Sequence, residues 1–150
     1  MRRIIIVLSL FCLVSCGGTG TGNPGITNTS SGVVTASAAI LQSICTLLAS
    51  CAGGPTFSSC VSGIQNTSGL DVKLGLSPGT FSNFLAIEAA ESAGTIQANA
   101  TAATLCESQV SSLSCSNTAV QAAYQAGQSN PYLSVPGMIP TAAGSCISVF

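Results

Sequence analysis

The cysteines constrain the fold of this chain more than any other sequence feature. Two of its eight cysteines lie within the first 16 residues, and six are spread over the remainder: Cys45, Cys51, Cys60, Cys106, Cys115 and Cys146. An even number of separated cysteines in an exported chain predicts three disulfides. Free thiols or a zinc site are the alternatives, but the chain has no histidine and no Cys-x-x-Cys motif, which zinc sites commonly use.

The beginning of the chain has the pattern of an export signal. Met1-Arg2-Arg3 is a short basic segment, and residues 4–14 are apolar except for Ser9. This combination is typical of a secretory signal. The apolar run is shorter than the about 20 residues that a transmembrane helix needs. We therefore expect residues 1–15 to be a signal peptide.

The end of this signal resembles the lipobox of bacterial lipoproteins. Leu13-Val14-Ser15-Cys16 has the aliphatic residue, the two tolerated residues and the cysteine of that motif. The resemblance implies a diacylglyceryl thioether on Cys16, cleavage just before it, and a protein held in the cell envelope by lipid. In Gram-negative bacteria, Gly17 after the cysteine favours the outer over the inner membrane. The alternative is plain secretion, with cleavage after Gly17.

Charge is scarce in the predicted mature chain. Lys73 is its only base, and its acids are Asp71, Glu88, Glu91 and Glu107, which gives a net charge of −3. A surface with one base cannot follow a phosphate backbone, so nucleic-acid binding is excluded as a function. Solubility must instead come from the many Ser, Thr, Asn and Gln side chains.

Residues 16–32 predict a flexible tether, because they are rich in Gly, Thr, Ser and Asn and cannot bury apolar surface. A tether of this length reaches about 20–25 Å. Residues 33–150 form the predicted domain.

Helical periodicity predicts five short helices in this domain. The first covers 33–51, with Ser30 or Ser31 as its cap and an apolar stripe of Ile40, Ile44, Leu47, Leu48 and Cys51. The others cover 56–65, 80–93 with Thr80 as cap, 99–114 with Asn99 as cap, and 116–126. The uncharged first segment could also be a second membrane span, but Gln42 and its Ser and Thr residues argue against this.

The connections are less regular. Residues 66–79 predict a loop, within which Leu70, Val72, Leu74 and Leu76 alternate like a short strand. Residues 129–145 contain three prolines and predict an extended arm, followed by a strand-like stub at Ile147 and Val149. The predicted fold is all-α: a small irregular bundle of about five short helices, three disulfides and a C-terminal arm.

Spacing gives a hypothesis for the disulfide pairing. Cys51 and Cys60 flank a Gly-Gly-Pro turn between two helices and are expected to bond. Cys106 and Cys115 would lie about 13 Å apart on one helix, too far to bond. Cys45–Cys106 and Cys115–Cys146 then follow. The cysteine pattern also loosely resembles small helical Cys-rich lipoproteins of predatory and gliding bacteria, which have no assigned activity.

No catalytic motif emerges. The absence of histidine excludes an imidazole base, and Lys73 lacks a serine three residues before it. Glu88 and Glu91 lie one helical turn apart, which permits a carboxylate pair, although a solvated helix face is the expected arrangement. Glu107 is expected to face water, and Asp71 to lie in a loop. We expect no cofactor and no metal.

Two classes of function remain open. The first is a non-catalytic envelope lipoprotein that binds a protein or glycan partner, or that acts in adhesion or structure. The second is a small carboxylate-dependent enzyme, such as a glycan hydrolase. An enzyme requires Glu88 or Asp71 to face another acid across a pocket, whereas a binding module requires an exposed apolar or Ser/Thr-rich face.

Overall fold

The computed structural model describes residues 34–125 and 130–150, which belong to one compact unit, Val33–Phe150. Within these residues the fold is all-α and contains no strand, as predicted. The α-helices are α1 (Ala36–Ser50), α2 (Phe57–Gln65), α3 (Leu70–Lys73), α4 (Phe84–Ser92), α5 (Ala100–Ser111), α6 (Thr118–Ala122) and α7 (Val135–Met138). Two 3-10 helices, η1 (Pro131–Ser134) and η2 (Cys146–Ser148), complete them.

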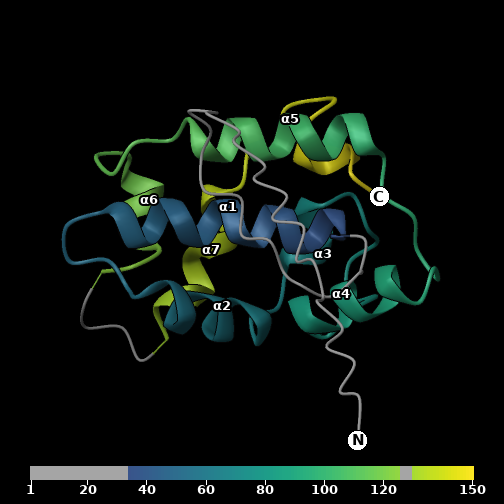
Figure 1. The fold of residues 1–150 in the computed structure, drawn as a ribbon, viewed down its shortest axis with the longest axis horizontal. Coiled ribbons are helices and arrows are strands. Elements are labelled where there is room, and N and C mark those ends of the chain that lie inside the picture. Colours follow the sequence, from purple (N-terminus) through teal and green to yellow (C-terminus); the bar gives the residue numbers. More distant parts are fainter. Residues whose placement is uncertain (1–33, 126–129) are drawn as a thin grey trace, which may run out of the picture. The chain divides into compact units, whose positions relative to one another are not determined.

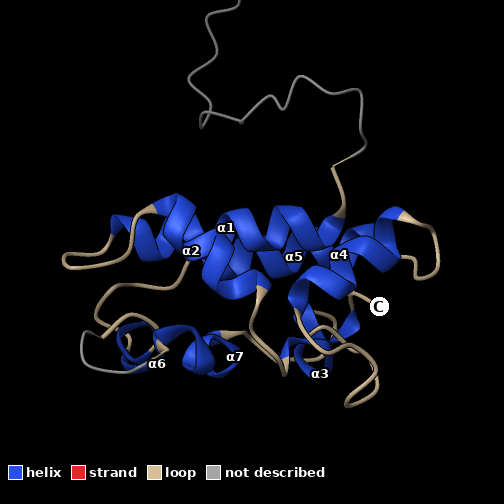
Figure 2. Cartoon of the chain, turned by 90° about the horizontal axis from the view of Figure 1, so that it is seen from below, coloured by secondary structure: helices blue, strands red, loops and turns tan. Residues whose placement is uncertain are grey.

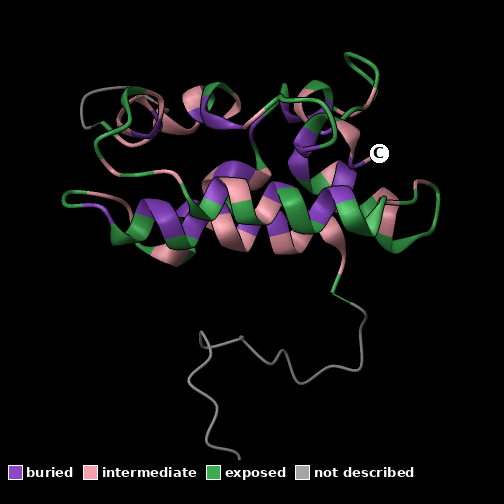
Figure 3. Ribbon diagram, turned by 90° about the horizontal axis from the view of Figure 1, so that it is seen from above, coloured by how far each residue is buried: buried purple, intermediate pink, exposed green. Residues whose placement is uncertain are grey.

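The helices of this unit lie in two layers (Figures 1 and 2). In the first layer α1 lies between α5 on one side and α2 and α4 on the other; α3, α6 and α7 form the second. The inward faces carry the buried residues (Figure 3). All five residues of the predicted apolar stripe of α1 are buried there, which confirms that helix and its orientation.

Side-chain caps fix where most helices begin. Asn99 accepts hydrogen bonds from the N–H groups of Thr101 and Ala102, as predicted for α5. The predicted caps of two other helices are wrong, because Thr35 caps α1 and Asn83 caps α4. In both cases the cap lies three to five residues later than the sequence pattern suggested, which shortens the helix. Ser30 and Ser31 lie outside the described residues.

Three segments differ from the sequence prediction. The expected strand is the short helix α3. Leu70, its first residue, and Leu74, its C-terminal cap, are buried, while Val72 is exposed. The expected extended arm contains η1 and α7, because prolines in a first helical turn lose no hydrogen bond. The terminal stub is η2 rather than strand-like.

Three disulfides link the six cysteines, but every predicted pairing is wrong. The bonds are Cys45–Cys60, Cys51–Cys115 and Cys106–Cys146. Cys45 and Cys51 are six residues apart, so they point in directions about 120° apart around α1. Cys45 therefore bonds to α2, while Cys51 bonds to the segment that follows α5. The prediction also extended α5 through Ser114, whereas it ends at Ser111 and leaves Cys115 in a connection.

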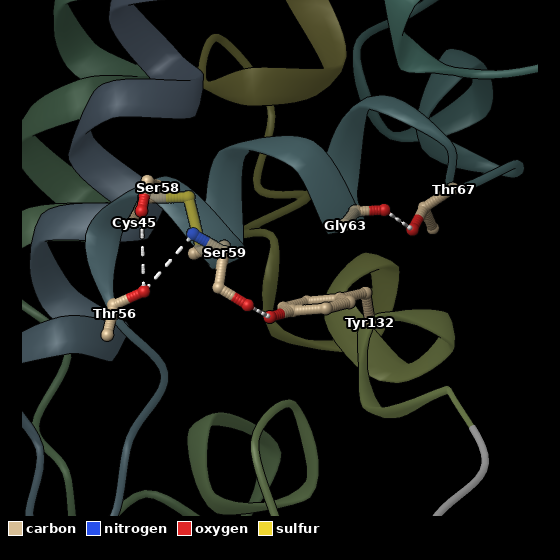
Figure 4. Close-up of a disulfide and its surroundings, with 8 residues drawn as sticks. Cys45, Thr56, Ser58, Ser59, Gly63, Thr67 and Tyr132 are labelled. Carbon is tan, nitrogen blue, oxygen red and sulfur yellow. Dashed lines mark hydrogen bonds between the residues drawn. A yellow bond between two sulfur atoms is a disulfide. The ribbon is translucent and has the colours of Figure 1, made fainter.

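The C-terminal segment packs on α2 through Tyr132. Its ring lies against Gly63, and a Cβ atom at position 63 would overlap the ring (Figure 4). The Tyr132 hydroxyl lies 3.3 Å from Oγ of Ser59, within hydrogen-bonding distance. Glycine normally weakens a helix interior, but here it makes room for an aromatic ring from a segment far along the chain.

We expect Gly63→Ala to have opposite effects in two backgrounds. In the natural chain it should destabilise the fold by about 2 kcal/mol, because the new methyl group displaces the ring. In a Tyr132→Ala background it should stabilise α2 by about 0.5–1 kcal/mol, the usual gain from replacing glycine in a helix. Urea unfolding of the natural chain, the two single variants and the double variant measures both free-energy changes. An equal effect in both backgrounds would contradict the packing argument.

Candidate functional site

The predicted lipid site, Cys16, lies outside the described residues, as does the whole predicted tether. The described chain begins at Val34, whose side chain is exposed, and Thr35 then caps α1. The predicted tether joins the helical unit at these residues, so a pull on the predicted lipid anchor would act here first. The contacts around it are therefore the first part of the candidate site.

A carboxylate from α4 holds the beginning of α1. Glu91 accepts hydrogen bonds from the backbone N–H of Ala36 at 2.8 Å and of Ser37 at 2.9 Å. It also accepts one from the Ser37 hydroxyl, and Ser37 is completely buried. The N-terminal N–H groups of a helix have no partners within the helix. We call these contacts of Glu91 with Ala36 and Ser37 the Glu91 clamp.

The Glu91 clamp is electrostatically favourable. A negative charge at a helix N-terminus interacts well with the helix dipole, and hydrogen bonds to a charged acceptor are stronger than neutral ones. The expectation that Glu88 and Glu91 form a solvated helix face is therefore wrong for Glu91, which is engaged by another helix 54 residues away in sequence.

Glu88, the other member of this possible carboxylate pair, is half-buried and accepts a hydrogen bond from Nε2 of Gln65 on α2 at 2.9 Å. Burial raises the pKa of Glu88 above its ordinary value; the Gln65 hydrogen bond opposes this increase, and the charge of Glu91 adds to it. The two carboxylates thus interact, but each is also held by a different helix, Glu88 by α2 and Glu91 by α1.

Asp71 is buried in α3 rather than in a loop, and its carboxylate is occupied by backbone groups. One oxygen accepts the N–H of Val72 at 2.9 Å, and the other accepts the N–H of Gly79 at 2.8 Å. The side chain therefore closes the turn that follows α3. Its neighbour Lys73, the only base predicted in the mature chain, ends that short helix.

Glu107 on α5 is partly buried, contrary to the expectation that it faces water. Burial raises the pKa of Glu107 above its ordinary value. A raised pKa means that the folded state binds the proton more tightly than the unfolded state. The ionised form of this side chain therefore costs stability, and that cost is present only above its ordinary pKa.

We expect Glu107→Gln to stabilise the fold increasingly as the pH rises. Near pH 4 the difference in melting temperature from the natural chain should be smallest, because Glu107 is mostly protonated in both the folded and the unfolded state. It should become positive as the pH rises through the raised pKa of Glu107, and should then level off. Melting curves at pH steps from 4 to 7 measure it, and a difference that stays constant or decreases with pH would contradict the assignment.

Neither a metal site nor a membrane span is found in the part of the chain that the structure describes. No group of three or more Cys, Asp or Glu side chains there is arranged to hold a metal ion. No helix of residues 34–125 and 130–150 combines the length and apolar character needed to cross a bilayer.

Comparison with known proteins adds no relative. No family model, curated protein or solved structure matches this chain.

Sequence reasoning identified the acids but missed what they do. The hydrogen-bond partners of Glu91 and Glu88 come from other helices. Nothing in the local sequence around residues 36 or 65 predicts these contacts. Asp71 had one local signal, since Asp side chains in turns commonly accept backbone N–H groups of the residues that follow them. The contact of Tyr132 with Gly63 had a weaker one, an unexplained glycine inside a helix.

Proposed function

We propose that this protein is a lipid-anchored lipoprotein of the cell envelope, attached to a membrane through Cys16. The observation that carries the proposal is Leu13-Val14-Ser15-Cys16 at the end of an apolar run that follows Arg2-Arg3. Two or three acyl chains on one residue hold a protein stably on a bilayer, whereas a single chain does so only marginally. The three disulfides support an oxidising compartment outside the cytoplasm. Gly17 favours the outer membrane.

The proposed activity is non-catalytic: binding, adhesion or a structural role toward a protein or glycan partner. Two of the acids that an enzyme would need, Glu91 and Asp71, accept backbone hydrogen bonds that hold the fold, which supports this choice. The exposed residues of α1, α2 and α5 are Ser, Thr or Ala except for Leu105. Such a surface offers many hydroxyl groups and little charge, and so suits a neutral partner.

The test is intact-mass analysis of protein recovered from membranes, with and without reduction. The expected mass corresponds to a chain that begins at acylated Cys16, and alkylation after reduction should add six groups. Cys16→Ala should remove the lipid and prevent release of the signal at that site. Cys12→Ala, a matched change inside the apolar run, should leave acylation unchanged.

A mature chain that begins at Gly18 without lipid would overturn the anchor and support plain secretion. The binding role is tested separately, by incubating the purified protein with glycan arrays and with isolated envelope fractions. Hydrolysis of a glycan that Glu88→Gln abolishes would overturn the non-catalytic assignment in favour of a carboxylate-dependent enzyme.

A further inference from the structure

The three disulfides differ in their access to solvent. Four of the cysteines are completely buried, those of Cys45–Cys60 and Cys106–Cys146. Cys51 retains 5% of its surface, and Cys115 is only partly buried. A thiol reagent must reach a sulfur atom to attack it, so access decides which bond of a folded protein is reduced first. Cys51–Cys115 is therefore the bond most open to attack.

The surroundings of Cys115 favour that access. It lies in the connection between the end of α5 at Ser111 and Asn117, the cap of α6. Its neighbours Ser114 and Ser116 are both exposed, and their hydroxyl groups lie 2.8 Å apart. The segment therefore presents a short polar loop to solvent, with no helix of its own to cover the sulfur.

This bond also has a special place among the cross-links of the described residues. Cys45–Cys60 ties α1 to α2, and Cys106–Cys146 ties α5 to η2. Cys51–Cys115 is the one bond between these two cross-linked pairs, and it spans 64 residues. Its reduction would leave α1 and α5 joined by side-chain packing, while each pair keeps its own covalent link.

We infer that Cys51–Cys115 is a thiol–disulfide exchange site for a dithiol reductant, and that the other two bonds are permanent. One thiolate of the dithiol attacks Sγ of Cys115. The bond to Cys51 breaks, and the Cys51 sulfur leaves as a thiolate that takes up a proton. The second thiol of the reductant then loses its proton and attacks the mixed disulfide, releasing Cys115 as a thiolate. The protein disulfide gains two electrons, and the dithiol is oxidised to a disulfide.

The position of Cys51 makes the exchange reversible. Cys51 directly follows α1 and is its C-terminal cap. After reduction, α1 remains linked to α2 through Cys45–Cys60, so the Cys51 sulfur keeps its place in the fold. The two buried disulfides and the packing between α1 and α5 keep Cys51 and Cys115 close together. The bond can therefore re-form when an oxidant is present.

The test is timed reduction of the folded protein, followed by alkylation and peptide mapping. One arm uses dithiothreitol, and the other uses reduced thioredoxin as a dithiol protein. We expect Cys51 and Cys115 to be alkylated together, about tenfold or more faster than the other four cysteines. Selectivity in both arms identifies a site that admits a protein reductant. Selectivity with dithiothreitol alone also supports the site and restricts it to small dithiols.

Equal rates for all six cysteines would overturn the inference, because they would show that reduction requires global unfolding. Faster labelling of Cys45 and Cys60 would overturn it as well. A second measurement uses the double variant Cys51→Ser, Cys115→Ser. Its circular dichroism should match that of the natural protein in which Cys51–Cys115 alone is reduced. Its remaining two bonds should resist dithiothreitol as they do in the natural protein. Loss of that resistance would show that the bond cannot open independently.

Discussion

Glu91→Ala is expected to destabilise the helical unit by about 3 kcal/mol, measured by urea unfolding with the disulfides intact. The change removes the acceptor of two backbone N–H groups and one hydroxyl at the beginning of α1. An unpartnered buried polar group costs about 1–3 kcal/mol, and Ser37 is completely buried. Part of this cost can be relieved by fraying of the first turn, because Ala36 lies near the surface. The total loss is therefore expected to be smaller than three times the cost of one unpartnered buried group.

Two further variants separate the charge from the hydrogen bonds. Glu91→Gln keeps one acceptor oxygen and should cost about 1–2 kcal/mol, the part of the stabilisation that depends on charge. Glu107→Ala, which removes an acid from α5 instead, should change the free energy of unfolding by about 0.5 kcal/mol or less. Equal effects of Glu91→Ala and Glu107→Ala would mean that Glu91 does not hold α1. Hydrogen exchange should also accelerate at residues 38–41 in Glu91→Ala alone.

The Glu91 clamp shows why local pattern predicts some features of this chain and not others. The apolar stripe of α1 and the Asn99 cap depend on residues within one or two helical turns, so their spacing determines them. The clamp depends on how α4 lies against α1, and no spacing rule connects residue 91 to residue 37. The all-α class was predictable for the same local reason, because the helical spacing of apolar residues can be recognised within each amphipathic segment alone.

The disulfide pairing failed because it was inferred from distance along the sequence. Cys51 and Cys60 are closer in sequence than Cys51 and Cys115, and a turn lies between them. The direction in which each sulfur leaves its helix decides the matter instead, and that direction depends on where the helix ends. The helix prediction was right to exclude a Cys106–Cys115 bond, but the assignment of Cys51 to Cys60 left Cys115 without its true partner.

Gly75→Ala is expected to have the second large effect, a loss of about 3 kcal/mol or more. Gly75 has a φ of +91°, which an L side chain rarely adopts. Its Cα also faces the end of the chain: a Cβ atom there would collide with the carbonyl oxygen of Ile147 and lie 2.9 Å from that of Phe150. Relieving the collision would displace η2 and strain two hydrogen bonds, Phe150 N–H to Leu74 and Asn99 N–H to Val149.

Gly79→Ala is the matched control for that prediction. Gly79 has a similar φ of +74°, but nothing lies within 4 Å of a Cβ atom at this position. It should therefore show the conformational cost alone, about 1–2 kcal/mol. The difference between the two losses in free energy of unfolding measures the cost of the collision between position 75 and the C-terminal segment. If both lose the same stability, then the collision at Gly75 is relieved without cost. In that case Cys106–Cys146 and the Asn99 hydrogen bond would be enough to hold the end of the chain, without close packing against α3.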